Sequence, residues 1–146
     1  MSATLLLSTT AQAELGGTMA SVVVDGDRLG AKTVSTATGS YTRHDLTRTN
    51  SGMVHEFTNS SGQVFAVVWQ GPGKPDLRQL LGPHFAALQQ DSAIGQTMHA
   101  LRRPLQVNQS DLQIQTGGHM GWFHGVAFIP SLAPPGFSPA ELAPQP

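Results

Sequence analysis

The stretch that most constrains the fold is an unbroken apolar run, Val64–Trp69, which lies just before a break and a helical pattern. The run has six residues and is rich in β-branched and aromatic side chains. Because it is too short for a helix, it predicts a strand with both faces covered. The sequence Gly71-Pro72-Gly73 ends this strand. We therefore expect a buried strand at the centre of a sheet.

The residues that follow predict an amphipathic helix from Pro75 to about Gln90. Proline suits the first position of a helix, and Asp76 suits its first turn. Apolar residues recur at helical spacing and form one stripe that should face the core: Leu77, Leu80, Leu81, Phe85 and Leu88. Gly82-Pro83 interrupts the pattern, and proline inside a helix removes a backbone hydrogen bond. We expect a kink or two abutting helices there.

The N-terminal half predicts strands separated by turns. In chain order we expect a short strand over 21–24, a loop over 30–39, an edge strand over 41–47 and a strand over 53–58. In the last of these, alternation places Met53, His55 and Phe57 on one face. Together with the central run, these strands predict an antiparallel meander.

The C-terminal part predicts a hairpin followed by a tail. Residues 112–116 alternate between apolar and polar side chains, and residues 120–129 alternate again, with Trp122 and His124 on one face. Gly117-Gly118 lies between the two runs, and only glycine adopts the positive φ of a tight turn without strain. We therefore expect the hairpin to turn there. The chain is rich in proline from residue 131 onward.

The expected architecture is α+β: an antiparallel sheet of five or six strands packed on one kinked amphipathic helix, with a Pro-rich C-terminal tail. The expected boundaries are 1–13 for the remnant of a signal peptide, 14–130 for a single domain and 131–146 for the tail. A chain of 146 residues fits one domain with its own core.

The first residues resemble the end of a secretory signal peptide. A short apolar segment precedes Ala11-Gln12-Ala13, which has the small-x-small pattern of a cleavage site before Glu14. The positively charged leading region of a signal is missing, so an N-terminus with an incidental Ala-x-Ala is the alternative. We expect an exported protein, periplasmic or secreted. No stretch approaches the roughly 18 apolar residues of a membrane span.

Composition excludes several classes of function. Charged residues make up 12% of the chain and the net charge is −1, with no basic cluster beyond Arg102-Arg103, so a nucleic-acid partner is not expected. The chain has no cysteine, which excludes disulfides, thiolate metal sites and cysteine nucleophiles. No cofactor is expected.

Candidate site residues are few. Six histidines invite a metal hypothesis, but His119 and His124 lie five apart, and on one strand this spacing points them to opposite faces. There is no Gly-x-Ser-x-Gly nucleophile elbow, and enzymatic activity is not favoured. The candidate contacts for a ligand or partner are Trp69, His119, Trp122 and His124, because tryptophan combines a large apolar face with a donor. Burial of either tryptophan in the core is the alternative.

Three segments carry a resemblance to a known family. They are Val64–Pro72, Pro75–Gly82 and Ser110-Asp111-Leu112 through Gly117–Met120. The chain resembles the bacterial family catalogued as domain of unknown function 2844, and the likeness covers most of its length. The resemblance implies an exported protein with a signal peptide, and it implies no assigned activity.

Two hypotheses of function remain. The first is a non-enzymatic binding or interaction module of the cell envelope, with an unknown envelope protein or a small ligand as partner. The second is a small hydrolase or metal-dependent enzyme with a tertiary histidine–carboxylate site. Convergence of histidine and carboxylate in a concave pocket would favour the second, and a closed core with a shallow aromatic surface would favour the first.

Overall fold

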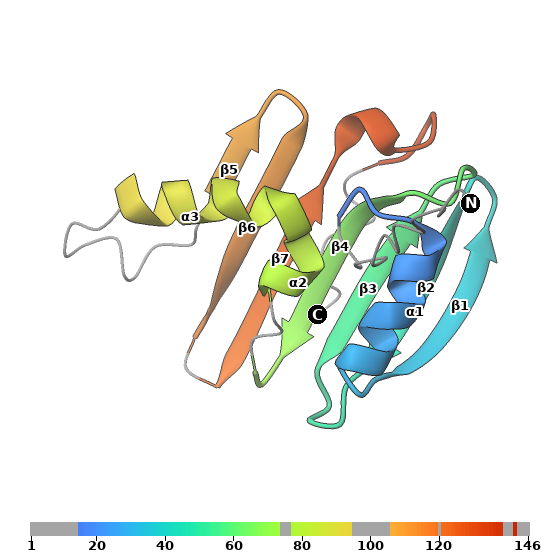
Figure 1. The fold of residues 1–146 in the computed structure, drawn as a ribbon, viewed down its shortest axis with the longest axis horizontal. Helices are drawn as coiled ribbons and strands as arrows, with labels where there is room; N and C mark the ends of the chain where they lie inside the picture. Colours follow the sequence, from blue (N-terminus) through green and yellow to red (C-terminus); the bar gives the residue numbers. More distant parts are fainter. Residues whose placement is uncertain (1–14, 74–76, 95–105, 120, 139–141, 143–146) are drawn as a thin grey trace, which may run out of the picture.

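The computed structural model describes residues 15–73, 77–94, 106–119, 121–138 and 142. The fold is α+β, and its described strands form one seven-stranded antiparallel sheet in the order β1-β2-β3-β4-β7-β6-β5 (Figure 1). The strands are β1 (Lys32–Thr38), β2 (Tyr41–Thr47), β3 (Met53–Thr58), β4 (Val64–Gly71), β5 (Gln106–Gln109), β6 (Leu112–His119) and β7 (Trp122–Phe128). The helices are α1 (Met19–Arg28), α2 (Leu77–Leu81) and α3 (Phe85–Ile94), with 3₁₀ turns η1 (Gly82–His84) and η3 (Pro130–Leu132). The sheet is therefore larger than the five or six strands expected from the sequence.

The apolar run forms β4, the middle strand of the sheet. β4 pairs with β3 on one side and with β7 on the other, so both of its edges and both of its faces are covered. A bulge at Phe65 shifts the β3–β4 register, because Phe57 pairs with Ala66 while Thr58 pairs with Val64. The prediction of a central buried strand is confirmed.

Two elements before β2 differ from the prediction. Residues 21–24 lie within helix α1 instead of a strand, and residues 32–38, which fell in an expected loop, form strand β1. The three consecutive valines at 22–24 favour a strand locally, but Val22 is buried against the sheet, and this packing overrides a weak local preference. β1 carries no buried side chain, so it lacks the apolar alternation by which strands are recognised. Because β1 lies outside β2, β2 is not an edge strand.

The helical segment after β4 is divided as expected. Gly82 has a φ of 51°, and Gly82–His84 form a 3₁₀ turn that separates α2 from α3. The whole apolar stripe from Leu77 to Leu88 contributes to one hydrophobic cluster with the sheet, so the predicted docking face is confirmed. The segment is two helices joined by a turn instead of one kinked helix.

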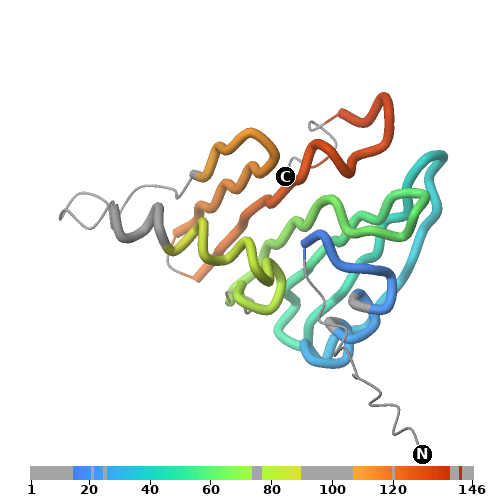
Figure 2. Tube along the Cα trace, turned by 45° about the horizontal axis from the view of Figure 1, so that its top comes forward, coloured from blue at the N-terminus to red at the C-terminus, as the bar shows by residue number. Residues whose placement is uncertain are grey.

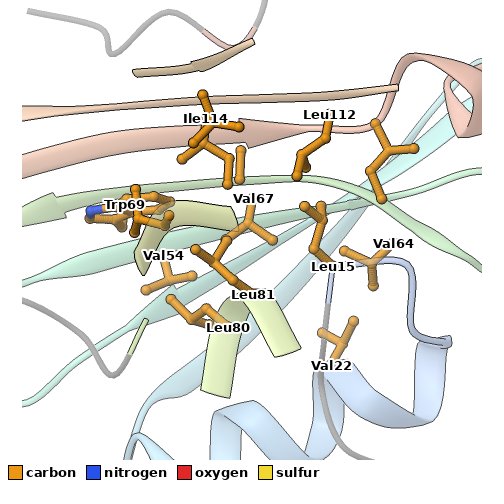
Figure 3. Close-up of a cluster of buried hydrophobic side chains, with 14 of the residues drawn as sticks. Leu15, Val22, Val54, Val64, Val67, Trp69, Leu80, Leu81, Leu112 and Ile114 are labelled. Atoms are coloured by element: carbon orange, nitrogen blue, oxygen red, sulfur yellow. The ribbon is translucent and has the colours of Figure 1, made fainter. Parts of the chain in front are cut away.

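All three helices cover the same face of the sheet, which we call the helix-covered face (Figures 1 and 2). Side chains from all three helices and from strands β2 to β7 meet in its core, and Leu15 from the N-terminal segment fills the space between α1 and α2 (Figure 3). The amide of Leu15 donates to the carbonyl of Leu80, and the amide of Gly16 donates to the carbonyl of Val64. The N-terminal segment is thus tied to both the sheet and α2.

The opposite face, which we call the far face, carries a second core made of aromatic side chains. Its members are Tyr41, Phe57, Phe65, Phe128 and Phe137, whose rings pack with centroids 4.9–6.4 Å apart. Phe137 and the buried Leu142 belong to the C-terminal tail. The Pro-rich tail therefore packs on the sheet and closes part of the far face.

The hairpin turns later than predicted. β6 continues to His119 and β7 begins at Trp122, so the chain turns between these two residues and Gly117-Gly118 are inside the ladder. Gly121, with a φ of 88°, takes the conformation that the turn requires. Gly117 is small for another reason, because the His124 ring lies over it and a Cβ there would be 2.7 Å from Nε2.

Candidate binding surface

The four side chains singled out in the sequence do not lie together. Trp69 is only 2% exposed and lies on the helix-covered face between Val54 and Ile114 (Figure 3). Its indole ring occupies the space in which a side chain at position 125 would lie, and that position is Gly125. Trp69 is therefore part of the core, and we leave it out of the surface described below.

The other three side chains share one face. His119 pairs with Trp122 and Gly117 pairs with His124, and residues paired across an antiparallel ladder lie on the same side of the sheet. This side is the far face, because Val126 and Phe128 continue it along β7 to the aromatic core. The expectation that the two histidines point to opposite faces was wrong, because they lie on two strands of a hairpin instead of one strand.

These residues share the far face, and we call them the hairpin surface: His119, Trp122, His124, Gln70 and Gln115. Trp122 is 43% exposed and is one of four large apolar side chains that are exposed among the described residues. Gln70 of β4 pairs with His124, and Gln115 lies next to it on β6 beyond Gly117. The surface therefore offers one large aromatic ring surrounded by amide and imidazole groups.

A charged cluster lies on the far face over β2 and β3. Nδ1 of His55 lies 2.5 Å from Oδ1 of Asp45, and the guanidinium of Arg43 contacts both oxygens of the same carboxylate. Asp45 thus has two basic partners, so its charge is compensated inside the cluster. This arrangement is typical of a structural ion pair between neighbouring strands.

A second polar cluster lies on the helix-covered face and is buried. His44, Glu56 and Thr58 are each 1% exposed. Nε2 of His44 lies 3.0 Å from Oγ1 of Thr58, and its Nδ1 lies 2.7 Å from Oγ of Ser35. Burial lowers the pKa of His44, although the negative charge of Asp45 opposes this effect. The neutral ring therefore joins β1, β2 and β3 through hydroxyl groups.

One pocket of about 380 Å³ brings together residue types used in hydrolysis. It contains His84 of η1, Asp111 of the β5–β6 turn and Ser131 of η3. Oδ1 of Asp111 accepts a hydrogen bond from the Ser131 amide at 2.9 Å, and its Oδ2 accepts one from the Ser131 hydroxyl at 2.5 Å. These bonds, first the side-chain and then the backbone one, lower the pKa of Asp111, and His84 adds a smaller effect in the same direction.

The geometry of this pocket is that of a structural clamp. The Ser131 hydroxyl directs its hydrogen to Asp111, whereas a catalytic serine directs it to the histidine that removes it. The carboxylate instead ties the β5–β6 turn to η3 at the end of β7. Sequence reasoning did not anticipate this contact, although Ser110-Asp111-Leu112 is one of the segments that carry the family resemblance.

Neither a metal centre nor a membrane-spanning helix is found in the described segments. Within the part of the chain that the structure describes, no group of three histidine, aspartate or glutamate side chains is placed to hold a metal ion. None of the helices described here has both the length and the apolar character needed to cross a membrane.

Comparison with known proteins places this chain among its relatives. A family model described as "Protein of unknown function (DUF2844)" matches residues 11–142, which is most of the sequence. The chain belongs to this family. No curated protein and no solved structure matches the chain. In this DUF2844 member, the motif segments form the central strand, the docked helix α2, and the turn whose Asp111 clamps η3.

Proposed function

We propose that the protein is an exported, non-enzymatic binding module of the bacterial envelope, and that the hairpin surface contacts its ligand. The observation that carries this proposal is the exposed indole of Trp122 with His119 and His124 on the same face. Tryptophan combines a large apolar face with an N–H donor, and it is enriched at binding surfaces relative to the rest of a protein surface. Membership in the DUF2844 family is consistent with the proposal and does not specify it.

The chemistry of the surface favours an uncharged, polyhydroxylated ligand such as a glycan. Neither β6 nor β7 contains an Asp, Glu, Lys or Arg residue, so the surface offers no charge pair to an ionic ligand. An indole ring can stack on the apolar face of a sugar. Amide and imidazole groups can donate hydrogen bonds to sugar hydroxyl groups and accept hydrogen bonds from them. Gln70 and Gln115 are placed on either side of His124 for such contacts.

Binding to soluble fragments of envelope glycans tests the proposal. Calorimetric titration should give saturable binding, and Trp122→Ala should weaken it at least tenfold because the stacking platform is lost. The control is Gln113→Ala, an exposed far-face residue of β6 near the other end of the strand. In Trp122→Phe, the buried Trp69 remains, so loss of the ligand-induced fluorescence change would assign the signal to position 122. Equal affinity of Trp122→Ala and the wild type would contradict the proposal.

Export is tested separately. The precursor, expressed in a bacterial host, should give an envelope-fraction product that begins near Glu14, as mass spectrometry of the intact chain would report. A product found only in the cytoplasm with residues 1–13 still attached would contradict export.

A hydrolase remains the second candidate because His84, Asp111 and Ser131 line one pocket. Hydrolysis of a chromogenic ester, peptide or glycoside would support it if the rate were lost in His84→Ala and retained in Trp122→Ala. The direction of the Ser131 hydrogen bond is the reason that we rank this candidate second.

A further inference from the structure

Strand β1 ends the sheet on one side, and no second strand of the described residues pairs with its outer edge. Among the strands that the structure describes, it pairs only with β2, through seven consecutive residue pairs without a bulge. All seven of its residues are exposed. At the other end of the sheet, β5 has only four residues. The two edges therefore differ, and β1 presents the longer row of backbone groups that a further strand can bind.

β1 has little of the protection that edge strands usually carry. Natural edges are blocked by proline, bulges, brevity or charges directed along the strand. β1 contains no proline, and its single charge, Lys32, is at its first residue. Threonine and valine, which favour strands, make up four of its seven residues. The strand is thus suited to pair with another strand.

We propose that β1 is the docking strand for a second copy of this chain, through antiparallel β1–β1 pairing that joins two sheets into one. With the two-fold axis at Ser35, Lys32 lies opposite Thr38 of the other copy, and Val34 lies opposite Thr36. The two lysines are then at opposite ends of the ladder, so no like charges meet. A second copy also offers an open strand of the same length, which makes every position of the ladder usable.

Exposed apolar residues lie on both faces of the sheet near β1. Of the four large apolar side chains exposed in the described part, Met19 and Val23 lie one turn apart on α1, whereas Val34 of β1 is on the far face, where it pairs with Asp45. α1 packs on β1, where Gly26 approaches Thr33 so closely that a Cβ would be 2.6 Å from its Oγ1 (Figure 1). A two-fold axis perpendicular to the sheet keeps both α1 helices on one side of it. Met19 and Val23 of both copies are then exposed on the same side of the joined sheet, and Val34 of both copies on the other side.

Sedimentation and light scattering of the protein over a range of concentrations test this inference. The wild type should approach twice the monomer mass as its concentration rises. The double variant Val34→Lys/Thr36→Lys places lysines opposite each other across the axis and should remain monomeric, as should Val34→Glu/Thr36→Glu. An equimolar mixture of the two should form heterodimers. The control, Gln113→Lys/Gln115→Lys, has the same spacing on β6 and should dimerise like the wild type.

A cysteine variant gives a second readout that does not depend on affinity. The chain has no cysteine, so Ser35→Cys introduces one thiol at the proposed axis. Paired strands bring such residues within disulfide range, so mild oxidation should give a covalent dimer, whereas Asn108→Cys on the β5 edge should not. A monomeric wild type at all concentrations, or equal cross-linking of the two variants, would overturn the proposal. Lysine and glutamate variants that dimerise separately would overturn it as well.

Discussion

Gly125 permits the closest contact between the sheet and its core, and replacing it tests how the central strands are packed. A Cβ at this position would overlap the six-membered ring of Trp69, and it would lie 2.8 Å from Cη2. The ring has no free space beside it, because Trp69 is 2% exposed and Leu80, Ile114 and Val54 pack in the same cluster. Gly125→Ala should therefore either displace the ring or separate β4 from β7.

The expected cost lies at the upper end of the range for overpacked cores, about 3 kcal/mol. For a domain of this size, such a loss should lower the Tm by about 10 °C. Chemical denaturation followed by circular dichroism measures the free energy of unfolding. In a Trp122→Phe background, the emission of the single remaining tryptophan should shift to longer wavelength if its ring is displaced toward water.

Two comparisons separate the clash from a general effect of losing glycine. Gly121 has a φ of 88°, and no atom lies within 4 Å of the place that a Cβ would take there, so Gly121→Ala should cost only about 1 kcal/mol of backbone strain. In a Trp69→Leu background the clash is absent, so Gly125→Ala should cost less than about 1 kcal/mol. If Gly125→Ala costs the same with and without the Trp69 ring, the packing argument is refuted.

Three other changes test separate parts of the structure. Leu81→Ala should lower the free energy of unfolding by about 2–5 kcal/mol because Leu81 is fully buried. Gln89→Ala, at an exposed position, should change it by less than about 0.5 kcal/mol. Equal denaturation midpoints for the two variants would mean that the helices are not docked through this face. The pKa of His44 is lowered in the folded state, so its contribution to the free energy of unfolding is complete above the unfolded pKa of 6.5 and is lost as the pH falls through the folded pKa. His44→Gln should therefore reduce the dependence of unfolding free energy on pH in that window. The same pH dependence in the variant and the wild type would contradict this. The pKa of Asp111 is also lowered in the folded state, so its contribution to the free energy of unfolding is present above pH 3.8 and is lost at lower pH. Asp111→Asn should remove this loss of stability in acid and should speed hydrogen exchange at the Ser131 amide.

The elements that could be predicted are those whose buried residues form a recognisable apolar pattern in the local sequence. β4 is covered on both faces, so its sequence is apolar throughout, and the Leu77–Leu88 stripe docks on one face, so its apolar residues recur at helical spacing. Gly82-Pro83 also breaks the helix where its chemistry requires. In each case the residues that decide the structure are neighbours in the chain.

The missed features depend on contacts between distant segments. Helix α1 is stabilised by the burial of Val22 against the sheet, and strand β1 is stabilised by backbone pairing with β2. Neither contact can be predicted from the local sequence of the element itself. Predicting the common face of His119 and His124 required knowing that the chain turns between His119 and Trp122. The Asp111–Ser131 clamp joins residues 20 positions apart, and no spacing rule predicts such a pair.

The closing of the far face by the tail has a consequence for how the chain matures. Phe137 and Leu142 follow the last strand of the sheet in the chain, so the aromatic side chains of β3, β4 and β7 are covered only after residues up to 142 have been made. A chain released by the ribosome before Phe137 has been made would keep an exposed aromatic surface that is prone to aggregation. Proteases and chaperones that recognise exposed aromatic residues would therefore distinguish a chain that lacks Phe137 and Leu142 from one that has them.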